Sequence, residues 1–231
     1  MVENREKTSA PWKAIAEMWN TYFTSPSRIS EDESDKYGEW LSYYADESKK
    51  VLLLGVTPEI RDILAEIGCK VTCVDINEEM IAAMNSLKEA ENPDEEVINE
   101  NWLDNSLEKN NFDIVIGDAV LPNVNWEDRE ELLSEVKRVL KAEGLFITRA
   151  FCVPVEKRFE NIHELLEEFS NKKPNYKSAL ELVLELQFLA YDPQDHLGTF
   201  TEPKKMLKEI RSEKGFDFES ENLNKILDIV W

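Results

Sequence analysis

The sequence predicts an α/β fold: a doubly wound, mostly parallel sheet with N-terminal helices and a helical C-terminal extension. Short apolar runs alternate with amphipathic segments between about residues 50 and 151, which is typical of strands and crossover helices. The stretch VLLLGVTPEIRDILAEIG, residues 51–68, joins a buried strand to a helix through a very short turn. Ligands of open α/β sheets bind at the carboxyl ends of strands, so we look for a site in the loops that follow them.

Three regions follow from this pattern. Residues 1–48 are expected to form a helical cap, residues 49–151 the α/β core, and residues 152–231 a mostly helical extension packed on the same domain. In the cap, aromatic residues recur at helical spacing, and Ser30 with Glu33 predicts a capping box at the start of a second helix. These aromatic residues are expected to pack on the sheet, with the lining of a pocket as a further role for one of the rings.

Periodicity places the elements in order. Apolar, β-branched runs predict strands at residues 51–56, 71–74, 95–101, 112–117 and 145–151. Amphipathic spacing predicts further helices at residues 58–67, 77–87, 126–143, 156–171 and 175–190. Thr57 and Asn77 are predicted N-caps, while Gly68 and Gly144 are predicted helix stops.

The chain is strongly acidic, with 48 Asp and Glu against 27 Lys and Arg, a net charge of −21 and a pI near 4.5. Nucleic-acid binding draws on clustered basic residues, so a nucleic-acid partner is disfavoured. The acidity fits either solubility or a cationic substrate or cofactor.

No apolar stretch reaches the roughly 18 residues of a membrane span, and the start MVENREKTSA is too polar for a signal peptide. We therefore expect a soluble cytoplasmic protein without a membrane partner. Cys69, Cys73 and Cys152 are interpreted as small core residues in a reducing compartment. The oligomeric state is left open, a homodimer included.

The first strand–helix turn argues against a nicotinamide dinucleotide. A bound pyrophosphate needs glycines and free amides at the helix start, but here only Gly55 is present. Pro58 removes one amide donor, and the carboxylate of Glu59 would repel phosphates. A Walker-type loop is missing as well.

Asp75, at the end of the second strand, favours a nucleoside without phosphates in this turn. Its carboxylate can accept hydrogen bonds from two ribose hydroxyls. Helix capping is the alternative role, although Asn77 is better placed for it.

Five motifs resemble those of class I S-adenosylmethionine-dependent methyltransferases over about residues 50–151: VLLLGVTPEI, VDINEEM, NWLD, FDIVIGDAVL and RVLKAEGLFITRAF. The first motif is similar to a subset with LLGVTPE in place of a glycine-rich loop. The resemblance implies a Rossmann-like core, S-adenosyl-L-methionine as cofactor, and methyl transfer to a small-molecule acceptor without a metal ion.

The resemblance also implies roles for individual residues. Gly55 would let the backbone approach the methionine part of the cofactor, Asp75 would hold the ribose, and Ile76 would pack on the adenine. Asn101 stands where the family has an acid that bonds the adenine amino group. Trp102 would flank the adenine or, alternatively, belong to the core.

Asp118, after the fourth strand, would be the catalytic residue and would also contact the cofactor, by binding its ammonium group or orienting the nucleophile of the acceptor. Two loop glycines of the family are replaced, so Thr57 or nearby backbone has to supply the lost contacts. Arg28 is the candidate cation for the methionine carboxylate, with a solvated surface arginine as the alternative.

Two interpretations therefore stay open. If the altered first motif no longer supports cofactor binding, the chain is a non-catalytic methyltransferase-like binding or interaction protein. Other catalytic groups are scarce: His163 is expected at the surface, and His196 is a candidate base in a loop.

Overall fold

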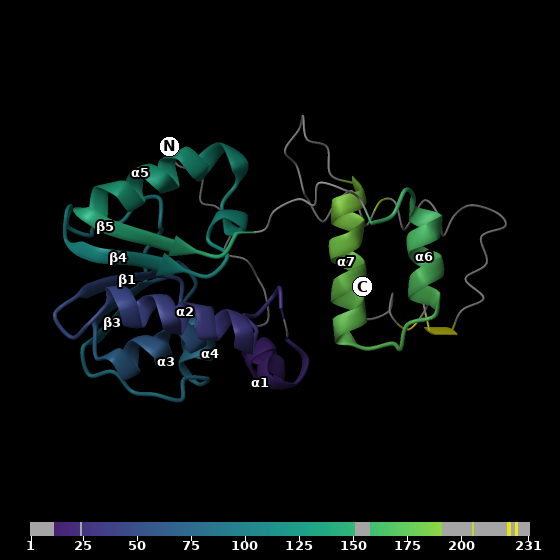
Figure 1. Cartoon of the computed structure of the whole chain (residues 1–231), viewed down its shortest axis with the longest axis horizontal. Helices are drawn as coiled ribbons and strands as arrows, with labels where there is room; N and C mark the ends of the chain where they lie inside the picture. The colour runs from purple at the N-terminus through teal and green to yellow at the C-terminus, as the bar shows by residue number, and fades with distance from the viewer. Residues whose placement is uncertain are drawn as a thin grey trace. The chain divides into compact units, whose positions relative to one another are not determined.

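The protein is described here by a computed structural model, in which residues 12–23, 25–150 and 158–190, with 205, 221, 222 and 225, are placed. The chain forms two compact units, Met1–Phe151 and Cys152–Trp231, each described by itself (Figure 1). Cys152 and His196 lie outside the described residues.

A five-stranded sheet forms the centre of the first unit. Its strands are β1 (Lys50–Leu54), β2 (Lys70–Val74), β3 (Glu95–Ile98), β4 (Phe112–Gly117) and β5 (Leu140–Thr148). The order is β3-β2-β1-β4-β5 and every neighbouring pair is parallel. The strand order reverses between β1 and β4, which is the point where open α/β sheets bind ligands. The doubly wound parallel sheet predicted from the sequence is confirmed.

Helices cover both faces of this sheet (Figure 1). They are α1 (Trp12–Tyr22), α2 (Glu31–Tyr44), α3 (Pro58–Ile67), α4 (Glu78–Asn85) and α5 (Arg129–Val139), with short 3₁₀ turns at Leu121–Asn123 and Trp126–Asp128. Val51 and Leu53 of β1 pack in the core under α1 to α4, whereas Leu52 and Leu54 pack in the core under α5. This alternation follows from the two-residue period of a strand.

The helix starts agree with the sequence at two of three predicted caps. Ser30 and Glu33 form the predicted capping box at α2, and the side chain of Asn77 accepts from two amides at the start of α4. The prediction for Thr57 is wrong, because its side chain makes no capping hydrogen bond. Pro58 follows as the first helical residue, a position where proline is favoured because its missing amide would have no partner inside the helix.

The last crossover also differs from the prediction. Helix α5 ends at Val139 and β5 already begins at Leu140, so residues 140–144 are strand rather than helix. Leu140 pairs with Phe112 at the start of β4, and a register irregularity follows. Sheet pairing thus overrides the helical spacing of this stretch.

In the second unit, α6 (Ile162–Ser170) and α7 (Tyr176–Ala190) share a small apolar core. Asn161 caps α6 through a hydrogen bond from the Glu164 amide. The packing of this extension on the α/β core stays a prediction. None of the helices among the described residues is long and apolar enough to cross a membrane.

Candidate functional site

The residues directly after the five strands form a row along the carboxyl edge of the sheet. The final strand residues are in register or nearly so, which brings the next residue of each strand beside its neighbours. In sheet order, from β3 to β5, this row consists of Asn99, Asp75, Gly55, Asp118 and Arg149. Two of the predicted carboxylates therefore flank the predicted glycine.

Gly55 keeps the centre of the row open. Its φ of +102° is a backbone conformation that favours glycine, and its amide donates to the carbonyl of Val74 at 2.8 Å. A Cβ on this residue would lie 3.7 Å from Trp102 Cζ2 and 4.0 Å from Asp75 Oδ2. An indole and a carboxylate thus border the space above Gly55.

Asp75 is buried, with 5% of its surface exposed, yet its carboxylate is only half used. Oδ1 accepts from the Asn77 amide at 2.8 Å, whereas Oδ2 accepts no hydrogen bond from any described residue. Burial raises the pKa of this carboxyl, against the opposing hydrogen bond from Asn77. A ligand with hydroxyl donors would supply a hydrogen-bond partner for this second oxygen.

Three further predicted residues lie at the β2–β3 end of the row. Ile76 exposes half of its surface directly after Asp75, which suits an apolar ring. The Trp102 Nε1 donates to the Val74 carbonyl at 2.7 Å, so its indole is fixed at the edge of the sheet. Asn101 Oδ1 accepts from the Leu103 amide at 3.0 Å, which leaves one lone pair for an external donor.

Both oxygens of Asp118 accept hydrogen bonds at the other end of the row. Arg149 binds it in a bidentate manner, with Nε 2.9 Å from Oδ1 and Nη2 2.7 Å from Oδ2. The Tyr37 hydroxyl donates to Oδ1 at 3.2 Å. Burial raises the pKa of Asp118, and Arg149 opposes this rise. Burial also works against the charge of Arg149, but the bonds to Asp118 and Glu33 outweigh it and raise the pKa of the guanidinium.

Arg28 contacts the start of α3. Its Nε donates to Glu59 Oε1, which also accepts from Trp19 Nε1 at 3.1 Å, and its Nη1 donates to the Trp19 carbonyl at 3.2 Å. The negative charge of Glu59 is therefore compensated by Arg28. The Thr57 hydroxyl makes no hydrogen bond with the described residues and remains available to a ligand.

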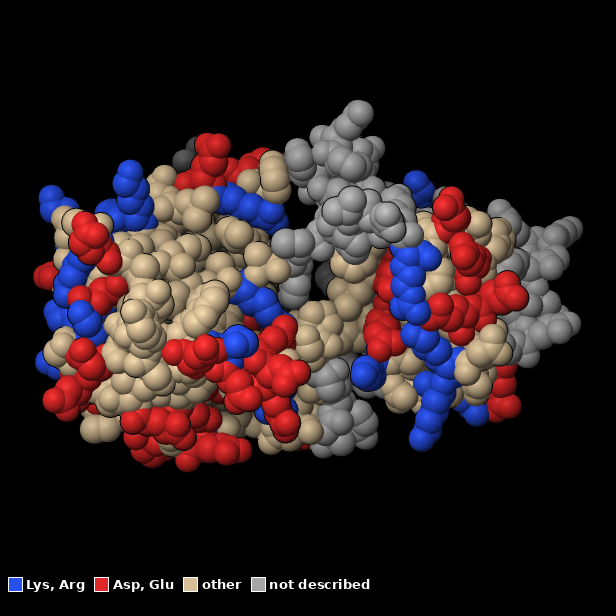
Figure 2. Space-filling model, in the orientation of Figure 1, with Lys and Arg blue, Asp and Glu red and all other residues tan. Residues whose placement is uncertain are grey.

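A cleft of about 600 Å³ opens beside this contact. Figure 2 shows acidic side chains gathered on the face of the first unit that carries α3. Carboxylates from α2, α3 and the loop after α4 line the cleft, together with Arg28: Asp35, Glu59, Asp62, Glu66 and Glu89. The lining includes neither Asp75 nor Asp118, so this cleft and the row of residues at the strand ends are different features.

Sequence reasoning missed Arg149, and it expected Tyr37 to pack on the sheet or to line a pocket, not to form a polar contact. Their contact joins positions 112 residues apart, since the Arg149 amide donates to the Tyr37 hydroxyl at 3.0 Å. Arg149 is the first residue after β5 in the structure, whereas the sequence pattern placed it inside a strand at residues 145–151.

The α/β part of the chain matches a known family: residues 54–148 match the family described as "Methyltransferase domain". This match identifies residues 54–148 as a methyltransferase domain. Domains of this family use S-adenosylmethionine as methyl donor, so the predicted family and its cofactor are confirmed. The LLGVTPE subset stays a prediction.

Solved structures similar to this methyltransferase domain also carry such names. A SAM-dependent methyltransferase from Methanosarcina mazei is 29% identical over 44% of this chain and 52% of its own, with a TM-score of 0.39. An S-adenosyl-L-methionine-dependent methyltransferase from Methanococcus maripaludis is 19% identical over 64% and 67%, with a TM-score of 0.48. The glycopeptide N-methyltransferase MtfA, complexed with S-adenosyl-L-methionine, is 18% identical over 55% and 58%, with a TM-score of 0.44. The chain thus spans about half the length of the Methanosarcina protein. No curated protein matches the chain.

Proposed function

We propose that this protein binds S-adenosylmethionine along the β2–β1–β4 part of the row and transfers its methyl group to a small-molecule acceptor in the cytoplasm. The observation that carries the proposal is the buried carboxylate of Asp75, whose Oδ2 lacks a partner among the described residues and lies beside Gly55. Vicinal ribose hydroxyls are donors that satisfy such an oxygen.

The residues of the row fit the cofactor by their chemistry. Asp75 would accept from the ribose, and Ile76 would offer its exposed apolar surface to the adenine. Gly55 would let the methionine part lie close to the backbone, and Thr57 would supply a hydroxyl. Arg28 would reach the cofactor carboxylate with Nη2, which has no described partner, while its Nε stays on Glu59.

Asp118 would act through the lone pairs left on Oδ2, because Oδ1 already accepts from both Arg149 and Tyr37. Bound S-adenosylmethionine supplies an activated methyl group together with its own leaving group. The protein then has mainly to orient the nucleophile of the acceptor and exclude water. Asp118 would accept a hydrogen bond either from the cofactor ammonium group or from that nucleophile.

Calorimetric titration with S-adenosylmethionine, S-adenosylhomocysteine and NAD tests the binding step. The first two ligands should bind the wild type and NAD should not. Asp75→Asn should weaken both, whereas Asp94→Asn, with the same charge change at the amino end of β3, should not. Binding of NAD alone, or of none of the three, would overturn the proposal.

Turnover separates an enzyme from a protein that only binds the cofactor. Release of S-adenosylhomocysteine in the presence of a panel of metabolites should depend on the acceptor and should fall in Asp118→Asn. Binding without turnover on any acceptor would instead support the non-catalytic interpretation of the sequence.

A further inference from the structure

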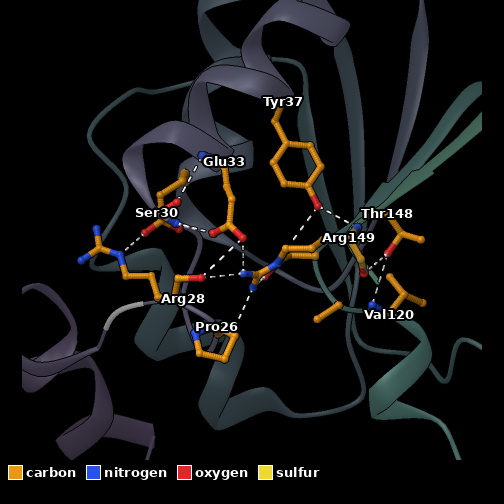
Figure 3. Close-up of polar contacts among 12 residues, drawn as sticks. Pro26, Arg28, Ser30, Glu33, Tyr37, Val120, Thr148 and Arg149 are labelled. Atoms are coloured by element: carbon orange, nitrogen blue, oxygen red, sulfur yellow. Dashed lines mark hydrogen bonds and ion pairs between the residues drawn. The ribbon is translucent and has the colours of Figure 1, made fainter. Parts of the chain in front are cut away.

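Arg149 connects three parts of the first unit that are distant in sequence (Figure 3). Besides its two bonds to Asp118, Nη1 donates to Glu33 Oε1 of α2 at 2.9 Å, and Nη2 donates to the Pro26 carbonyl at 2.7 Å. The guanidinium fork thus ties residues 25–37, here called the strap, to the ends of β4 and β5. Its geometry suits this role, because arginine can bind several acceptors in fixed directions.

A second contact reinforces this tie. The Tyr37 hydroxyl, at the end of the strap, accepts from the Arg149 amide at 3.0 Å and donates to Asp118. Tyr37 is buried, so these bonds are protected from water. On the other side of Gly55, Arg28 of the strap is bound to Glu59 at the start of α3. The strap is therefore fastened on both sides of the loop that follows β1.

The two ends of the Arg149 tie differ in strength. The Asp118 end is bidentate, and its side chains are 10% and 13% exposed. The Glu33 end rests on a single ion pair, and the Glu33 side chain is 31% exposed. Bidentate, buried pairs are the stronger ones, so the Glu33 end should open first.

Helix α2 keeps its start when this end opens. Glu33 Oε2 accepts from the Ser30 amide at 2.7 Å, and the Glu33 amide donates to Ser30 Oγ at 3.2 Å. This capping box does not use the oxygen that meets Arg149. Glu33 can therefore separate from Arg149 while α2 stays folded.

We propose that Arg149 is a positioning residue that retains the cofactor, because its ion pair with Glu33 keeps the strap closed on the strand ends. The inference rests on the proposed binding of S-adenosylmethionine at this edge. Glu33 touches neither the cofactor nor the acceptor in this proposal; it controls how often the strap opens. Arg149 also holds the Asp118 carboxylate in a fixed orientation toward the row.

Glu33→Gln is the sharpest variant: its single amide oxygen can still accept from the Ser30 amide, while the NH2 group then facing Arg149 is a donor and cannot replace the ion pair. Glu39→Gln is the matched control: it makes the same charge change on α2 at an exposed residue whose carboxylate pairs with Lys36. Arg149→Lys keeps the positive charge but loses the planar guanidinium group that binds several acceptors at once. Stopped-flow displacement measures the dissociation rate of S-adenosylhomocysteine, and the unfolding midpoint without ligand reports any general destabilisation.

Glu33→Gln should raise the dissociation rate about 3- to 10-fold, the range expected for loss of one partly exposed, charge-assisted bond. Glu39→Gln should match the wild type, and Arg149→Lys should also dissociate faster. Salt should accelerate dissociation from the wild type more than from Glu33→Gln, because the remaining contact is no longer an ion pair.

Each other outcome has a distinct meaning. An unchanged dissociation rate in Glu33→Gln, with binding intact, overturns the role of the strap and leaves the proposed function standing. A lower unfolding midpoint without faster dissociation shows that the tie is merely structural and also overturns the inference. If the wild type binds no S-adenosylhomocysteine, the proposed function itself fails, and the inference falls with it.

Discussion

The two halves of the carboxyl edge use their carboxylates in opposite ways. In the β1–β2 half, Asp75 is buried and keeps one oxygen without a described partner. In the β4–β5 half, both oxygens of Asp118 are bound by Arg149, and Tyr37 adds a further bond. Both halves occupy the same row and are similarly buried, but their hydrogen bonding differs.

This difference indicates that the β1–β2 half binds the ligand and that the β4–β5 half holds the strap closed. A carboxylate oxygen without a described partner can accept a hydrogen bond from a ligand, which is typical of a binding site. A satisfied ion-pair network holds segments in place and resists separation. The strained backbone of Ala119, with a φ of +49°, lies directly after Asp118 and fits a functional edge rather than plain structure.

Among the changes that test this comparison, removal of Arg149 should have the largest effect on the free energy of unfolding. Arg149→Gln leaves Asp118 and Glu33 without their cationic partner, so the free energy of unfolding should fall by about 3–5 kcal/mol. Urea denaturation measures this loss. Lys36→Gln, which breaks only an exposed pair on α2, should change stability by less than about 0.5 kcal/mol. A loss for Arg149→Gln as small as that of the control would contradict a satisfied network.

Asp75→Asn should act on ligand binding and not on folding. Loss of a charge-assisted acceptor should weaken S-adenosylmethionine by about 1.5–3 kcal/mol, roughly 10- to 100-fold. The free energy of unfolding without ligand at pH 7 should stay constant or rise, because the raised pKa of Asp75 means that its ionised form is disfavoured in the fold. Calorimetry and urea denaturation give the two quantities. A strongly destabilised variant would identify Asp75 as a structural residue instead.

Gly55→Ala tests the open centre between the two halves. The positive φ should cost about 1–2 kcal/mol of stability, and the added methyl group should reduce the space for a ligand. Gly38→Ala is the control: it lies inside α2, and an added methyl group would meet no atom within 4 Å, so the change should stabilise by about 0.5–1 kcal/mol. Both changes can be read from thermal unfolding. Equal effects at the two glycines would exclude a special backbone requirement at Gly55.

Tyr37→Phe sharpens the comparison within the β4–β5 half. The variant loses the hydroxyl between Asp118 and the Arg149 amide but keeps the aromatic ring in the core, so stability should fall by about 1 kcal/mol. The measurement is again urea denaturation. If Tyr37→Phe costs nothing, the hydroxyl adds nothing to the tie.

The pH dependence of stability should show the smallest effect, with opposite signs for Glu33 and Asp75. Burial works to raise the pKa of Glu33, but the Ser30 amide and Arg149 outweigh it and lower the pKa below 4.5. Glu33 thus contributes stability above that pH, and the contribution is lost as the pH falls through the lowered pKa. Asp75, with its pKa raised above 3.8, instead favours the fold as the pH falls.

Unfolding curves between pH 3 and 6 can separate these contributions. Glu33→Gln should reduce the loss of stability in acid, whereas Asp75→Asn should steepen it. The same slope in both variants would show that the two carboxyl groups do not differ in the way their hydrogen bonds indicate.

Much of the fold could be predicted because its signals are local. The strand-forming runs, the Ser30–Glu33 capping box and the Asn77 cap depend on residues close together in the chain. The end of α5 could not be predicted, because pairing of Leu140 with β4 competes with a helical pattern that remains equally good locally. Of the candidate site, the positions after the strands were predictable, but their hydrogen bonds were not.

The sequence by itself determined the parallel sheet, its family and the acids that follow β2 and β4, because periodicity and motif order are written along the chain. Only the tertiary structure decided that Asp118 is paired, while one oxygen of Asp75 has no partner among the described residues. The partner of Asp118, Arg149, lies 31 residues away, and the partner of Arg149 in α2, Glu33, lies a further 116 residues from it. Contacts over such separations follow from how strands and helices pack, and no local pattern encodes them.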